Sequence, residues 1–207
     1  MKKILFFILL IWLMTPYSAN GQMLVGGMSG GVAAGGASCQ FTPYLDTFSA
    51  ATDVINAAMS ADVHYAGMAG YTPAANKTIC KAEFKITCKY DLCSTTTYYA
   101  AIYTKSDTAL DAVVGEVSTG VTGNNGWDTT TVTFTFPGAS YPQITTSGTY
   151  AIVVYPNPTG DGGGTSALSV FYDTGIDANG GWAHYDTDKL REDYGSPGVQ
   201  LRLYTYE

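Results

Sequence analysis

The clearest pattern in the chain is a strict alternation of apolar and polar residues between positions 80 and 90. Every even position there is apolar or aromatic, and every odd position is charged or Thr. Alternation with a period of two places one face of a β-strand on a core and the other face in water. The pattern therefore predicts a strand whose even residues are buried and whose Lys81, Lys85 and Lys89 are exposed.

Six further segments show strand patterns, and turn residues such as those at 123–126 and 195–198 lie between them. These segments are 98–104, 113–118, 129–136, 149–155, 167–172 and 199–206. Many short strands separated by turns are typical of an antiparallel β-sandwich. We therefore predict an all-β fold of this class, with a barrel as the alternative; only residues 48–60 have helical spacing.

Residues 1–21 have the pattern of a secretory signal peptide. Lys2 and Lys3 precede an apolar run of eleven residues, and small residues stand before Gln22. A helix of eleven residues reaches only about 16 Å, roughly half the hydrocarbon thickness of a bilayer. We expect cleavage before Gln22, no stable membrane insertion afterwards, and a secreted protein that is extracellular or at the cell surface.

Residues 22–38, which come next, are rich in Gly and carry no charge. One interpretation is a flexible linker. The other is a strand donated to the sheet edge of a neighbouring subunit, since an apolar extension that cannot fold alone can complete another chain's sheet. The folded domain is expected over residues 39–207.

Composition and charge favour a folded, acidic β-protein. The chain is 46% hydrophobic and 13% charged, with 24 Gly and 16 Tyr, which differs from the composition of disordered chains. Its net charge is −7, and removal of Lys2 and Lys3 with the signal peptide makes it more negative still. Because such a surface repels phosphates and anionic lipids, we expect no nucleic-acid partner.

Four cysteines lie in the part of the chain expected outside the cell, where disulfides form. Four cysteines allow three pairings. Cys88 and Cys93 flank four residues that can turn back, so we expect this pair, which leaves Cys39 with Cys80. A zinc site is disfavoured, because no Cys-x-x-Cys is present and the chain has only two histidines.

The order of strands and turns resembles that of secreted jelly-roll modules of the choice-of-anchor type, found in bacterial surface proteins and in phage and environmental proteins. The segments that carry the resemblance are 70–73 (Gly-Tyr-Thr-Pro), 78–90, 98–103, 127–137, 148–154 (beginning Gly-Thr-Tyr), 180–183 and 199–204. The chain departs from the pattern in its cysteine loop and in the insertion at 161–164. The resemblance implies a non-catalytic extracellular jelly roll, similar in architecture to carbohydrate-binding modules, and it brings no catalytic residue.

A cluster after the turn at 179–181 is the candidate ligand-binding site, comprising Trp182, Tyr185, Asp186 and Asp188. Exposed rings stack on the C–H face of a sugar, and nearby carboxylates accept its hydroxyl groups. The alternative is that Trp182 belongs to the core and that the acidic residues are a solvated loop.

A structural calcium ion is the second candidate ligand, because hard cations collect carboxylate and amide oxygens from loops. Asp173, Asp177 and Asn179 begin an acidic stretch that could supply such oxygens. No twelve-residue calcium-loop pattern is present, and general surface acidity gives the same composition.

The sequence leads to two hypotheses and to no expectation of catalysis, since neither histidine lies in a motif. The first is a non-catalytic extracellular module for surface recognition or adhesion that binds a glycan or another cell-surface ligand. The alternative is a structural subunit of a self-assembling extracellular fibre or surface layer, in which residues 22–38 pair with a neighbouring subunit.

Overall fold

The computed structural model describes residues 38–207 except 52–53, 56–64, 89–92, 95, 107–108, 158–167, 175–180, 187–188 and 195–197. For residues 54–55, 157, 182–186 and 189–194 it describes the backbone alone. The predicted signal peptide and nearly all of the Gly-rich extension, up to residue 37, lie outside the described residues. Within the described ranges, no helix is both long and apolar enough to cross a membrane.

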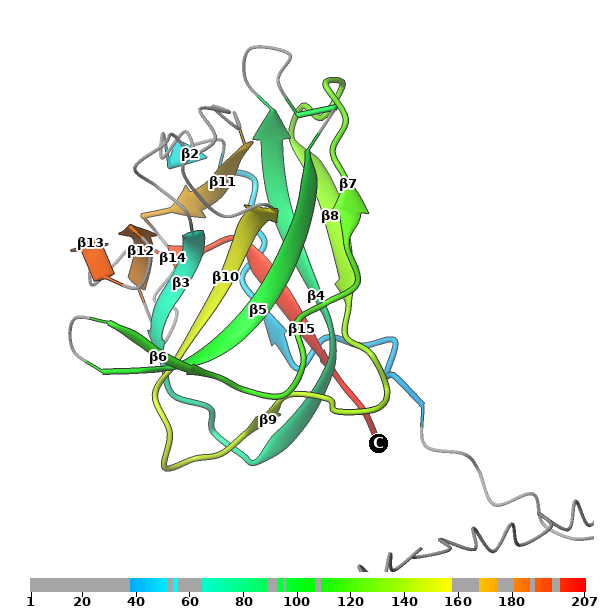
Figure 1. Ribbon diagram of the computed structural model, residues 1–207, viewed down its shortest axis with the longest axis vertical. Coiled ribbons are helices and arrows are strands. Elements are labelled where there is room, and N and C mark those ends of the chain that lie inside the picture. Colours follow the sequence, from blue (N-terminus) through cyan, green and yellow to red (C-terminus); the bar gives the residue numbers. More distant parts are fainter. Residues whose placement is uncertain are drawn as a thin grey trace, which may run out of the picture. The chain divides into compact units, whose positions relative to one another are not determined.

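The first of two antiparallel sheets has eight strands and is organised around β4 (Figure 1). Its strands are β1 (Leu45–Asp46), β2 (Val54–Ile55), β4 (Lys77–Cys88), β8 (Thr130–Thr135), β9 (Gln143–Ile144), β11 (Leu168–Asp173), β14 (Gly198–Val199) and β15 (Leu201–Thr205). The main order is β1-β15-β4-β11-β14; β8 and β9 also pair with β4, and β2 pairs with β11. The twelve residues of β4 thus contact strands from four distant parts of the chain.

The second sheet has seven strands, and one of the two sheets is strongly curled (Figure 1). Its strands are β3 (Tyr65–Tyr71), β5 (Thr97–Lys105), β6 (Leu110–Val113), β7 (Val121–Thr122), β10 (Tyr150–Asn157), β12 (Gly181–Asp186) and β13 (Lys189–Tyr194). The order is β13-β12-β3-β10-β5-β6, with β7 also paired to β5. β3 and β10 are therefore interior strands with a partner on each side.

The core lies between the two sheets, as the alternating patterns predicted. Ala82, Phe84 and Ile86 of β4 are fully buried and belong to the same cluster as Ile102 of β5. The rings of Phe84 and Phe134 meet edge to face at 6.0 Å, a favoured arrangement of aromatic pairs. The prediction of an all-β, sandwich-like fold is confirmed.

The lysines of β4 differ from the prediction, because Lys81 and Lys85 are half-buried rather than exposed. The Lys81 Nζ lies 3.6 Å from the centre of the Tyr204 ring and 3.1 Å from the Glu83 carboxylate. The Lys85 Nζ donates hydrogen bonds to two backbone carbonyls of the segment before β2. A period of two thus predicted the outer face of the strand but not what covers it. Lys89 lies outside the described residues.

Most predicted strands are present, but the one at 113–118 is wrong. β6 ends at Val113, and Gly115 adopts a φ of 70° that interrupts an extended strand. The chain then follows the edge of β5 through isolated backbone bonds, in which the Val114 and Ser118 N–H groups donate to carbonyls of β5. The short strand β2 lies within 48–60, where the spacing had been helical.

Two disulfides, Cys39–Cys80 and Cys88–Cys93, join the cysteines in the pairing expected from their spacing. The first links the segment before β1 to β4, and the second closes the connection between β4 and β5. Such bonds are typical of proteins that fold in an oxidising, extracellular environment.

Candidate functional site

The predicted ligand-binding cluster lies on a strand rather than on a loop. Trp182, Tyr185 and Asp186 belong to β12, which forms a hairpin with β13. In the backbone register Trp182 pairs with Met68 of β3, and Tyr185 pairs with Tyr65. The side chains of these three β12 residues, like the whole of Asp188, lie outside the described part of the structure.

The predicted calcium ligands are described only in part. Asp173 is half-buried at the end of β11, where it pairs with Gly198 of β14. Asp177 and Asn179 lie outside the described residues. Among the residues that are described, no three His, Cys, Asp or Glu side chains lie close enough together to hold a metal ion.

Three tyrosines on adjacent strands form a line across the outer face of the seven-stranded sheet. We call Tyr65 of β3, Tyr155 of β10 and Tyr99 of β5 the tyrosine row. The ring centres are 5.1 Å apart between Tyr65 and Tyr155 and 5.8 Å apart between Tyr155 and Tyr99. Tyr155 and Tyr99 are direct register partners. Tyr103 packs against Tyr65 from beside the row, at 5.9 Å.

Strand alternation explains why these rings point away from the core. Along β5, Tyr98 is fully buried between the sheets, whereas Tyr99 is half-buried on the opposite face. The outer face has its own small apolar cluster, on which the tyrosines pack. The buried members of this cluster are Ala69, Ala101, Leu110, Ala151 and Val153. Small residues under large rings support the rings from below and leave one side of each partly exposed to water.

The tyrosine row carries no charge at neutral pH. Burial raises the pKa of Tyr155 to about 12, and the neighbouring Tyr65 and Tyr99 hydroxyls add to this effect. Burial also raises the pKa of Tyr103, again with a contribution from Tyr65. The charged phenolate is disfavoured wherever water is removed from around the oxygen. The hydroxyls of Tyr155 and Tyr103 thus stay protonated and can both donate and accept hydrogen bonds.

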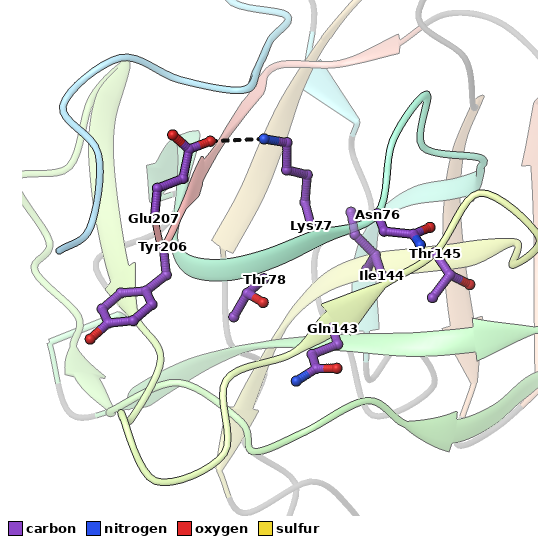
Figure 2. A pocket seen from close by; sticks show the side chains of 8 residues that line it. All are labelled: Asn76, Lys77, Thr78, Gln143, Ile144, Thr145, Tyr206 and Glu207. Atoms are coloured by element: carbon purple, nitrogen blue, oxygen red, sulfur yellow. Dashed lines mark hydrogen bonds and ion pairs between the residues drawn. The ribbon is translucent and has the colours of Figure 1, made fainter. Parts of the chain in front are cut away.

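A separate polar pocket of about 350 Å³ lies where β4 begins (Figure 2). It is lined by Asn76, Lys77, Thr78, Gln143, Ile144, Thr145, Tyr206 and Glu207. Figure 2 shows Thr78, Gln143 and Tyr206 reaching to one side of β4 and Lys77 and Glu207 to the other. Lys77 and Glu207 form an ion pair of 2.8 Å, so that the pocket's two charges largely neutralise each other.

Sequence reasoning did not identify the tyrosine row. A signal was present, because Tyr99 and Tyr155 occupy outward positions of strands that were predicted from their patterns. What the sequence did not contain was the pairing of β3, β10 and β5, which brings positions 65, 99 and 155 side by side (Figure 1).

No family model, curated protein or solved structure matches this chain. The functional interpretation therefore depends on the geometry and chemistry of the site.

Proposed function

We propose that this protein is a non-catalytic extracellular recognition module that binds a glycan through the tyrosine row. The observation that carries the proposal is the alignment of Tyr65, Tyr155 and Tyr99 on neighbouring strands, with ring contacts of 5.1 and 5.8 Å. Aromatic rings offer an apolar face to the C–H groups of a sugar, and the phenol hydroxyl at the rim bonds to its hydroxyl groups. Tyr185, which the sequence suggested as a ligand-binding residue, is the register partner of Tyr65.

Two further properties support an extracellular site with an uncharged ligand. Two disulfides are typical of proteins outside the reducing cytosol. The net charge of −7 disfavours nucleic acids and anionic membranes as partners, whereas a neutral glycan experiences no such repulsion. The proposal includes a signal peptide at 1–21 and secretion to the cell surface or beyond.

We assign the row to binding rather than to catalysis because of its ionisation. A general base needs a pKa near the working pH. The pKa of Tyr155 is raised to about 12, so its hydroxyl is a hydrogen-bond donor at neutral pH and a poor base. The resemblance to jelly-roll modules of the choice-of-anchor type belongs to this proposal, and the two packed antiparallel sheets support it.

The proposal is tested by retention of the purified protein on insoluble and soluble polysaccharides, measured by pull-down and by affinity electrophoresis. Tyr155→Ala removes the central ring of the row. We expect it to weaken retention about tenfold or more, the effect of truncating a central contact residue. The matched control is Tyr44→Ala, which removes an equally half-buried ring that stacks near Lys77 on the other sheet.

Melting temperatures of both variants separate lost binding from lost folding. The proposal requires that Tyr155→Ala and Tyr44→Ala melt at similar temperatures while only Tyr155→Ala loses retention. Equal retention of the two variants, or absence of retention of the native protein on every neutral polysaccharide tried, would contradict it.

A second candidate function, as a subunit of an extracellular fibre or surface layer, is favoured by how the Gly-rich extension is attached. Cys39 is bonded to Cys80 of β4, and Ser38 exchanges backbone hydrogen bonds with Glu207. An extension inserted into a neighbour's sheet would then pull on a covalent link to a central strand. Size-exclusion chromatography and negative-stain microscopy with and without residues 22–37 test this alternative, because only a donated segment makes assembly depend on it.

A further inference from the structure

We infer that the ligand of the tyrosine row is a linear, neutral polysaccharide that lies across the strands, with one sugar unit on each ring. This inference rests on the proposed function and makes it more specific, because a row could also bind a single sugar at one of its rings. Three features of the described residues carry it, namely the spacing of the rings, the paired backbone beneath them and the absence of charge in the row.

The spacing of the row fits a repeating ligand. Neighbouring strands in a sheet are about 4.8 Å apart, and one tyrosine on each of three adjacent strands gives a line of rings perpendicular to the strands. The observed distances between ring centres, 5.1 and 5.8 Å, follow from this arrangement. The same length is close to that of one pyranose unit in an extended chain. Successive sugars can therefore contact Tyr65, Tyr155 and Tyr99 in turn.

The row has a definite end on one side and a continuation on the other. Gly120 lies directly against Tyr99, since a Cβ added there would come within 2.9 Å of the ring. On the opposite side β12 pairs with β3, and Tyr185 is the residue opposite Tyr65. The described rings thus provide three positions, and the backbone register places a fourth tyrosine position on the next strand.

The backbone beneath the row excludes an extended peptide bound by strand addition. β10 is paired with β3 on one side and with β5 on the other. β3 is likewise paired with both β10 and β12. Strand addition needs an edge with free N–H and C=O groups, which interior strands do not have. A ligand on this face is held by side chains, as a sugar chain would be.

The charge of the row and of the chain selects among polysaccharides. The row consists of phenols, and the raised pKa of Tyr155 keeps its hydroxyl neutral well above physiological pH. The chain as a whole carries a net charge of −7. Uronic-acid and sulfated polysaccharides would be repelled by that charge and would find no cation in the row, whereas a neutral chain loses nothing.

The test is the dependence of affinity on ligand length, measured by calorimetry with β-1,4-linked glucose, xylose and N-acetylglucosamine oligomers of one to six units. We expect one of these series to gain about two- to tenfold per unit up to three units, the factor associated with one aromatic contact. Any further gain at the fourth unit should disappear in Tyr185→Ala. Longer oligomers should bind no more tightly than the tetramer.

Two variants locate the sugar positions. Tyr99→Ala removes the end ring and should shorten by one unit the length at which affinity stops rising. Tyr155→Ala interrupts the row and should reduce the affinity of the trimer to nearly that of a single sugar, whereas Tyr155→Phe, which keeps the ring and the fold, should retain the dependence on length. The control Tyr44→Ala should leave the series unchanged.

The outcomes distinguish the inference from the proposed function. Binding that depends on Tyr155 but is equal for one and three units would overturn the cross-strand chain while leaving glycan recognition intact. Tighter binding of a uronic-acid polymer than of any neutral one would also overturn it. Absence of binding to every saccharide would contradict the proposed function itself.

Discussion

Removing the Cys39–Cys80 disulfide is expected to destabilise the protein about twice as much as removing Cys88–Cys93. A disulfide restricts the unfolded chain, and in the chain-entropy model this effect grows with the logarithm of the loop that it closes. The residue separations are 41 for the first bond and 5 for the second. The model gives about 4 kcal/mol for the longer loop and about 2 kcal/mol for the shorter one.

The two bonds form a well-matched pair for this comparison. Each contains one cysteine that is almost fully buried, Cys80 at 1% exposed and Cys93 at 0%. Replacing both cysteines of a bond by Ala therefore removes a similar amount of buried sulfur in the two double variants. The difference between the variants then reports the loops rather than the packing.

The measurement is urea unfolding of each double variant without reductant, followed by far-ultraviolet circular dichroism and extrapolated linearly to water. The melting temperature should fall by about 8–16 °C for Cys39→Ala/Cys80→Ala and by about 4–8 °C for Cys88→Ala/Cys93→Ala, at about 2–4 °C per kcal/mol for a domain of this size. Equal losses, or a larger loss for the short loop, would refute the entropic reasoning.

Three further predictions concern single positions. Stability should fall between pH 10 and 12, because the native protein keeps the Tyr155 proton up to a pKa of about 12, whereas the unfolded chain releases it near 10; a urea midpoint that stays constant over this range would exclude the effect. Gly67→Ala should cost about 1–3 kcal/mol in urea unfolding, because a Cβ at that position would lie 2.7 Å from the Val153 Cα, and a loss below about 0.5 kcal/mol would show that β3 and β10 can separate without strain. Thr47→Val should cost about 1–3 kcal/mol, since the buried Thr47 hydroxyl accepts a hydrogen bond from the Leu201 N–H at 2.9 Å; Thr47→Ser should retain most of the stability, and equal losses for the two variants would count against this role.

The sequence predicted the faces of strands better than their partners. The alternation at 80–90 and 129–136 depends only on which side chains enter the core, and Phe84 and Phe134 are buried as predicted. The pairing of β12 with β3 depends on residues more than a hundred positions apart, which no local pattern contains. Residues 181–186 were therefore taken as part of a loop cluster, although their backbone forms a strand.

The same limit applies to the candidate site. Tyr99 and Tyr155 were each recognisable as outward residues of a predicted strand, but a row exists only once β5, β10 and β3 are adjacent. The disulfide pairing was easier to predict. The five-residue separation of Cys88 and Cys93 restricts the choice, and the remaining two cysteines then have only each other.

The central position of β4 has a consequence for the order in which the protein can fold. Its partners are contributed by residues 130–135, 143–144, 168–170 and 201–205, so β4 remains without most of its neighbours until nearly the whole chain has been synthesised. Non-local pairing of this kind slows folding and leaves strand edges open to aggregation in the meantime. Both disulfides, however, lie within residues 39–93. The covalent links around β4 can therefore close well before the hydrogen bonds that complete its sheet, and they would hold the strand's first half in place while the later strands arrive.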